Sequence, residues 1–364
     1  MNETIPQQND QRRCKYVFVC GLGRSGTSVL GRNVARLENC TGFKNTGVLE
    51  DEGQFLQDVY PNDLVYGGAA SFGFDPRAHL TEASHLVTPA NALKLRRSWE
   101  PYWEPNKSIC VEKTPGNLLR TRFLQAMFPH SYFVVIRRHP IAVSMANNQR
   151  WRMTFRSLHK LLDHWLHCHA IFDADKKYLK HVYELRYEDY IQNPDKFHQE
   201  IAAFIGTRLP EAPEQDSFRY VTQSRNPAGL RVPERAMEDV TGAHNQKYFN
   251  RWSDLLNNSR FKRYHRYVAV KYEPMIGKYG YSLTKDAAVT EEQIREAEQI
   301  SATAGALYCL LADGYGLLIR VPTQIKAKIM TQLRARLPEP MKTRIKQLLR
   351  RPLVTKHEPH STSC

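Results

Sequence analysis

The stretch Tyr16–Ser28 reads Tyr-Val-Phe-Val-Cys-Gly-Leu-Gly-Arg-Ser-Gly-Thr-Ser, and it decides the fold class. Its apolar first half is typical of a buried β-strand, and its second half is a glycine-rich turn. Apolar residues at helical spacing follow, so the pattern predicts a strand, a loop and then a helix. Such a loop directs backbone N–H groups and a helix N-terminus at one point, which favours an anion as the ligand.

The loop departs from a nucleotide P-loop at one position. The spacing from Gly21 to Gly26 fits the P-loop pattern, but Thr27 stands where that pattern has its lysine. In P-loop enzymes this lysine and Mg²⁺ neutralise a polyphosphate. Here the cation is Arg24, inside the loop. The loop therefore favours a single phosphate with one further charged group, while a P-loop nucleotide kinase or NTPase stays an alternative.

The composition fits a folded protein with one basic end. The chain has 364 residues, 41% of them hydrophobic, and a formal charge of +15. Residues 320–364 hold 11 Lys/Arg against 2 Asp/Glu, a net +9, with Ile325, Ile329 and Leu333 at helical spacing. A tail of this kind is typical of proteins that bind a nucleic acid, an anionic membrane or an acidic polymer. The alternative is a basic helix that is only exposed to solvent. We expect a peripheral membrane or polyanion contact and no nucleic acid.

Cysteine usage and hydropathy predict a soluble cytoplasmic protein. The seven cysteines form no Cys-x-x-Cys motif, which favours reduced thiols over disulfides. The polar residues 1–13 lack the apolar core of a secretory signal. The most apolar stretch, around 302–321, is interrupted by Asp313 and is too short to span a bilayer.

Alternation of apolar runs and helical patterns predicts an α/β fold with a central parallel sheet covered by helices on both faces. This is a three-layer, P-loop-like arrangement. The first strand-loop-helix unit is expected to span about 15–38. Further strands are expected in 108–111, 132–136 and 181–185, and further helices in 117–127, 141–147, 158–172, 195–205 and 291–300. Residues 39–107 are expected to be rich in loops, and 326–337 and 341–351 to be basic helices. We divide the chain into a flexible leader (1–14), one domain (15–285) and a helical basic C-terminal extension (286–364).

A second anion site is expected where the strand 132–136 ends. Arg137 and Arg138 follow this strand, and Ser144 lies shortly after them. Arginine offers forked donors and a charge, and serine adds a neutral hydrogen bond. Ligands of parallel sheets bind at the carboxyl ends of the strands. Two anion sites there suit a nucleotide that is phosphorylated at both ends of its ribose, with surface ion pairs as the simpler alternative.

These residues resemble a known family. The segment Gly23–Ser28 is similar to the 5′-phosphosulfate loop of sulfotransferases that use 3′-phosphoadenosine 5′-phosphosulfate (PAPS), in the arginine-bearing form of tyrosylprotein and many bacterial members. Val134–Pro140 is similar to their 3′-phosphate segment. Further matching segments are Glu112–Pro115, Leu185–Asp189 and Tyr248–Trp252. The resemblance covers about 15–283 and implies transfer of a sulfuryl group from PAPS to a hydroxyl of a carbohydrate, lipid or other small molecule, with no metal.

The resemblance also implies which residues hold the co-substrate. They are Gly23, Arg24, Ser25, Gly26, Thr27 and Ser28 for the 5′-phosphosulfate and Arg138 and Ser144 for the 3′-phosphate. Arg138 is preferred to Arg137 because it precedes x-Pro as in the family. The family usually has its serine eight residues after the arginine. In this chain that position is Ala146 when counted from Arg138 and Met145 when counted from Arg137, so Ser144 departs from the family spacing.

The same resemblance assigns catalytic roles. Arg24 would stabilise charge on the bridging oxygen, and Lys113 would supply a second cation near the transferring group. The acceptor hydroxyl needs a general base, and the family has a glutamate at about this distance after the loop. Glu52 is favoured, with Glu50 and then Asp51 behind it, and a solvated acidic turn is the alternative.

Two further alternatives remain. His159, His164, His167 and His169 could indicate a metal site, but they show no recognised zinc spacing, and leucines between them favour a packed helix. The chain could also be a non-catalytic protein that binds a nucleotide or polyanion.

Overall fold

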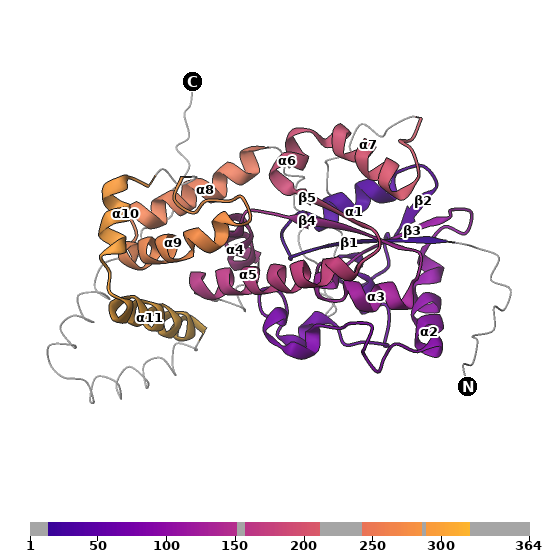
Figure 1. Cartoon of the computed structure of the whole chain (residues 1–364), viewed down its shortest axis with the longest axis horizontal. Helices are drawn as coiled ribbons and strands as arrows, with labels where there is room; N and C mark the ends of the chain where they lie inside the picture. The colour runs from indigo at the N-terminus through magenta and orange to yellow at the C-terminus, as the bar shows by residue number, and fades with distance from the viewer. Residues whose placement is uncertain (1–13, 151–156, 212–241, 286–288, 321–364) are drawn as a thin grey trace, which may run out of the picture.

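The computed structural model describes residues 14–150, 157–211, 242–285 and 289–320. Its centre is a parallel sheet of five strands in the order β2-β3-β1-β4-β5 (Figure 1). The strands are β1 (Lys15–Gly21), β2 (Cys40–Gly42), β3 (Ile109–Lys113), β4 (Ser131–Arg137) and β5 (Val182–Arg186). The expected central parallel sheet is therefore confirmed.

Helices cover both faces of this sheet, which gives the predicted three layers (Figure 1). One face carries α1 (Thr27–Ala35), α6 (Tyr187–Gln192) and α7 (Pro194–Ile205). The other face carries α2 (Pro89–Trp99), α3 (Thr121–Met127), α4 (Pro140–Arg150) and α5 (Leu158–Asp175). The central strand β1 shows why both faces are covered. Val17 and Val19 belong to the first core and Phe18 and Cys20 to the second, because successive side chains of a strand point to opposite faces.

The stretch 39–107 is more regular than the sequence predicts. It contains β2, helix α2 and short 3₁₀ segments, which are η1 (Leu49–Asp51), η2 (Gly53–Phe55), η3 (Asp63–Tyr66), η4 (Phe72–Phe74), η5 (Pro76–Ala78) and η6 (Glu100–Tyr102). Helix α2 begins after Thr88, whose hydroxyl caps the N–H of Asn91. Only Leu95 and Trp99 of this helix are buried, so it has little of the apolar periodicity by which a helix is recognised.

Two boundaries also differ from expectation. The strand β3 continues to Lys113 and so includes Glu112. The helix expected over 117–127 is divided into η7 (Pro115–Leu119) and α3, with Arg120 between them in a non-helical conformation (φ −128°, ψ 14°). Arg120 is fully buried there and forms an ion pair with Asp63. This tertiary contact overrides the local helical pattern.

Four further helices follow along the chain. They are α8 (Gly242–Asn257), α9 (Lys262–Gly277), α10 (Glu291–Glu298) and α11 (Ala302–Arg320), and they form the end of the molecule that is remote from β2 and β3 (Figure 1). Within the described ranges, no helix combines the length and apolarity needed to cross a bilayer. Residues 1–13 of the expected leader (1–14) and the basic helices expected over 326–337 and 341–351 lie outside the described residues.

Candidate functional site

The loop 22–26 joins β1 to α1 at the carboxyl edge of the sheet. Gly26 has φ 97°, in the left-handed region, and a Cβ atom there would lie 2.5 Å from the ring of Tyr187. Only glycine meets both conditions, because it has no Cβ and adopts positive φ at little cost. No side chain caps α1, so the N–H groups of its first turn, from Thr27 and Ser28 onward, can turn to a ligand.

Arg24 occupies a strained position in this loop. Its φ is 75°, a conformation that costs a non-glycine residue of the order of 1 kcal/mol and is found at functional sites. Its Nε atom is buried and finds no hydrogen-bond partner in the described part of the chain. The same holds for the hydroxyl of Ser25. Such unsatisfied donors fit an anion that completes their hydrogen bonds.

Arg138 connects the two predicted anion sites. It lies just after β4, is 4% exposed, and its Nη1 donates to the backbone carbonyl of Arg24 at 2.9 Å. Its guanidinium lies 4.2 Å from the ring centre of Tyr187 and 5.5 Å from that of Tyr248. Burial lowers the pKa of Arg138, the nearby tyrosines and Glu188 oppose this shift, and arginine remains charged. A buried cation therefore lies directly beside the loop.

Arg137 is turned away from the loop. It forms ion pairs with Asp173 on α5 and with Glu184 on β5, the latter at 3.1 Å. Of the two arginines that the sequence left as candidates, only Arg138 has a described contact with the loop.

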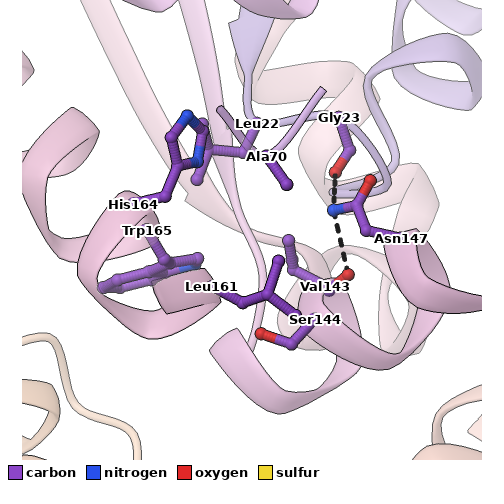
Figure 2. A pocket seen from close by; sticks show the side chains of 9 residues that line it. All are labelled: Leu22, Gly23, Ala70, Val143, Ser144, Asn147, Leu161, His164 and Trp165. Carbon is purple, nitrogen blue, oxygen red and sulfur yellow. Dashed lines mark hydrogen bonds between the residues drawn. The ribbon is translucent and has the colours of Figure 1, made fainter. Parts of the chain in front are cut away.

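Helix α4 contacts the loop through Asn147, which the sequence analysis missed. Its Nδ2 donates to the carbonyl of Gly23 at 3.3 Å and to that of Val143 at 3.0 Å (Figure 2). The predicted Ser144 lies one helical turn earlier, is 1% exposed, and its hydroxyl has no partner among residues that the structure describes. Asn147 is three residues after Ser144, so helical spacing could have indicated it.

Ser144 and Asn147 line a small cavity between the loop, α4 and α5 (Figure 2). The other lining residues are Leu22, Gly23, Ala70, Val143, Leu161, His164 and Trp165. Its volume of about 10 Å³ is roughly the room that one water molecule requires.

A second group of polar residues lies on the opposite side of β1. Lys113, at the end of β3, pairs in register with Val19 of β1. Its Nζ donates to the backbone carbonyl of Glu50 at 2.9 Å and contacts Oε1 of Glu52 at 3.2 Å. The structure therefore brings together Lys113 and two of the candidate bases, at the same edge of the sheet as the loop 22–26.

Glu52 is the candidate base whose surroundings suit the role best. It is 8% exposed, and its second carboxylate oxygen accepts from Nε2 of Gln54 at 2.7 Å. Burial raises its pKa, and Lys113 and Gln54 act in the opposite direction. Asp51 is engaged elsewhere, because its Oδ1 accepts from the backbone N–H and the hydroxyl of Thr46.

Glu112 is an anchor for the loop that carries Glu52. Its carboxylate accepts from the N–H of Gly53 at 2.9 Å, the hydroxyl of Thr114 at 2.5 Å and the amide of Asn117 at 2.6 Å. Burial raises its pKa to about 7, while these hydrogen bonds oppose the shift. These contacts favour a structural role for Glu112.

Gln54 leads from Glu52 to an ion pair that the sequence analysis did not anticipate. Its Oε1 accepts from the N–H of Asp63 at 2.9 Å, and Asp63 pairs with Arg120 at 2.5 Å. These residues are buried, and the two bonded pairs are separated by 9 and by 57 positions in the sequence. Because no local pattern links them, only the tertiary structure reveals the connection.

The four histidines of α5 contact their neighbours in the fold. His164 accepts from the N–H of Gly73 at 3.2 Å and lies 3.5 Å from the thiol of Cys168. His159 contacts the hydroxyl of Tyr264, His167 stacks on Phe74, and His169 packs between aromatic rings. In the ranges that are described, no three His, Cys, Asp or Glu side chains are grouped so that they could hold a metal ion.

The fold is that of an α/β protein with two candidate anion sites at the carboxyl edge of a parallel sheet. A family model described as "Sulfotransferase family" matches residues 17–211. The match spans more than half of the chain, so the chain belongs to the sulfotransferase family. No curated protein sequence matches it.

Among solved structures, the chain has distant likenesses to three sulfotransferase-related proteins. The sulfotransferase STF1 from Mycobacterium tuberculosis H37Rv is 16% identical, with 54% of this chain and 69% of that chain covered and a TM-score of 0.37. The sulfotransferase domain of the Synechococcus PCC 7002 olefin synthase is 17% identical, with coverages of 67% and 98% and a TM-score of 0.36. Retinol dehydratase in a complex with retinol and PAP is 16% identical, with coverages of 67% and 82% and a TM-score of 0.33. The family assignment rests on the family model alone.

Proposed function

We propose that the protein transfers a sulfuryl group from PAPS to a hydroxyl group of an acceptor. The observation that carries this proposal is the contact between Arg138 and the carbonyl of Arg24. It supports two anion sites that share one ligand, as a nucleotide with phosphates at both ends of its ribose requires. The absence of a lysine at Thr27 argues against a polyphosphate as that ligand.

The residues present fit such a nucleotide. The unsatisfied side-chain donors of Arg24 and Ser25 and the start of α1 suit the 5′-phosphosulfate, together with Gly23, Gly26, Thr27 and Ser28. On the other side, Arg138 suits the 3′-phosphate, and the unsatisfied hydroxyl of Ser144 can add a hydrogen bond.

The reaction is an in-line displacement at sulfur. The acceptor oxygen forms a bond to sulfur while the bond between sulfur and the bridging oxygen breaks, and adenosine 3′,5′-bisphosphate leaves. The carboxylate of Glu52 takes the hydroxyl proton, since a base of raised pKa remains effective near neutral pH. Arg24 stabilises the charge that develops on the bridging oxygen, and Lys113 orients Glu52. Glu50 is the reserve candidate for the base.

An equilibrium titration separates this function from its alternatives. We expect adenosine 3′,5′-bisphosphate to bind in the micromolar range with an affinity that a chelator does not change. Binding of Mg-ATP without binding of the bisphosphate would favour a kinase or NTPase. Transfer of labelled sulfate from PAPS to a panel of sugars, sterols, phenols and lipid alcohols then tests catalysis. Bisphosphate binding without transfer to any acceptor would favour a non-catalytic binding protein.

The basic segment 320–364 belongs to the proposal as a contact for an anionic surface. This part of the proposal rests on the charge of the segment in the sequence, because residues 321–364 lie outside the described residues. Peripheral association of a cytoplasmic enzyme with a membrane is the form that we favour.

A further inference from the structure

Helix α11 packs on the protein by one face only. Gly305 lies against the ring of Tyr267, and a Cβ atom at this position would collide with that ring. Asp313 accepts from the hydroxyl of Ser157 and pairs with Lys160 at 2.8 Å, both at the start of α5. These contacts fix which side of the helix faces the protein.

The opposite face of α11 is apolar and exposed. Leu307, Leu310 and Leu311 have exposed fractions of 49%, 68% and 54%. They lie at positions i, i+3 and i+4 and therefore on one side of the helix. No residue from Ala302 to Ala312 is charged. We name Leu307, Leu310 and Leu311 the leucine face.

Helix α11, which carries the leucine face, lies below α9 at the periphery of the molecule (Figure 1). Contiguous exposed leucines of this kind are typical of a surface that another molecule covers.

We propose that the leucine face of α11 is the apolar part of a site that docks the protein on an anionic lipid surface. The charge of the chain indicates which kind of molecule covers the leucine face. Residues 321–364, which directly follow α11, hold 10 Lys/Arg against 2 Asp/Glu. Interfacial helices bind anionic lipids through the combination of an apolar face and basic residues. A second copy of this chain is a poorer occupant, since its formal charge of +15 would repel the first.

Vesicle binding with matched variants tests this proposal. The full chain is sedimented with vesicles of phosphatidylcholine alone and with vesicles that contain equal parts of phosphatidylglycerol. The test variant is L310S/L311S. The control is L64S/V65S, because Leu64 and Val65 are an exposed apolar pair of 56% and 60% on η3, away from α11. Melting temperature and bisphosphate affinity show whether each variant is folded.

We expect binding to the anionic vesicles and weaker binding to phosphatidylcholine. L310S/L311S should lower the partition coefficient at least about tenfold, as expected for two half-exposed leucines that leave an apolar environment. L64S/V65S should stay within about twofold of the unmodified chain. Equal partition of L310S/L311S and the unmodified chain overturns the proposal, because the charge alone would then explain binding. A dimer in sedimentation velocity that L310S/L311S abolishes also overturns it, in favour of a second copy. Failure of bisphosphate binding would contradict the proposed function and leave this inference unaffected.

Discussion

Gln54 joins the candidate base Glu52 to the buried ion pair of Asp63 and Arg120. Its Nε2 donates to Oε2 of Glu52 at 2.7 Å, and its Oε1 accepts from the N–H of Asp63 at 2.9 Å. The other oxygen of Glu52 contacts Lys113. Both oxygens of the carboxylate are therefore held, which fixes its orientation toward the edge of the sheet where the loop 22–26 lies.

Glu52→Gln tests the base. We expect kcat to fall at least about 100-fold, the contribution typical of general base catalysis, while bisphosphate affinity stays unchanged. In the unmodified enzyme the rate should rise with pH as Glu52 ionises, and burial moves this rise above the ordinary pH range of a glutamate. The variant should lose this limb of the pH–rate profile. A similar loss in Glu50→Gln, with Glu52→Gln active, would transfer the role to Glu50.

Gln54→Met tests whether Gln54 positions Glu52. Loss of the donor to Oε2 should raise the pKa of Glu52, because that hydrogen bond stabilises the carboxylate. The acidic limb of kcat/KM should therefore move to higher pH. The matched control is Gln57→Met, which removes the Oε1 atom that accepts from the N–H groups of Val59 and Tyr60, two and three residues further on. A purely structural role of Gln54 would lower the rate in both variants and leave the limb in place.

Arg138→Ala tests the 3′-phosphate site. Loss of a charge-assisted hydrogen bond should weaken bisphosphate binding about 10- to 100-fold. Binding of adenosine 5′-monophosphate, which has no 3′-phosphate, should change less than about threefold by the same reasoning. Arg137→Ala is the neighbouring control, because Arg137 pairs with Asp173 and Glu184. Equal losses for the two nucleotides would show that Arg138 supports the loop instead of binding the 3′-phosphate.

The parts of the fold that the sequence predicted are those with strong local patterns. The strands β1 and β4 are nearly continuous apolar runs, and the turn after β1 carries three glycines in six residues. Helix α2 was not predicted, because it buries only Leu95 and Trp99 and so shows little apolar periodicity. The N-cap and N1 residues Thr88 and Pro89 were the main sequence features that indicated a helix there.

The sequence indicated those candidate site residues that lie within a single recognisable segment. Arg24 and Arg138 each follow an apolar run, so the sequence indicated two anion sites at strand ends, and the family resemblance added Lys113 near the transferring group. The chain of hydrogen bonds from Glu52 through Gln54 and Asp63 to Arg120 could not be predicted, because these residues come together only in the folded chain. The same is true of the contact between Arg138 and the backbone of Arg24.

Arg24→Ala tests the proposed transition-state role. We expect the transfer rate to fall about 100- to 1,000-fold, as for the loss of a donor to a developing oxyanion, with bisphosphate affinity changed less than about threefold. Arg24→Gly is the control for the backbone, because glycine adopts the φ of 75° at this position without strain. If Arg24→Gly were active and Arg24→Ala inactive, the backbone conformation and not the side chain would carry the effect.

Glu112→Gln should change the pH dependence of stability. The pKa of Glu112 is raised to about 7 in the fold, above the unfolded value of 4.5, so the folded state binds more protons between these pH values. Its contribution to the free energy of unfolding is therefore largest below pH 4.5 and falls as pH rises toward 7.

The magnitude of this effect follows from the difference in pKa. At about 1.4 kcal/mol per unit, the loss between these pH values is roughly 3 kcal/mol. Glutamine does not titrate, and Asn117 can turn its unsatisfied Oδ1 toward the new amide, so the network can persist in the variant. Urea unfolding at pH 5 and pH 7.5 should show a smaller decrease in stability for Glu112→Gln than for the unmodified chain. Equal decreases would mean that Glu112 is already ionised at pH 5, because its three hydrogen-bond donors outweigh its burial.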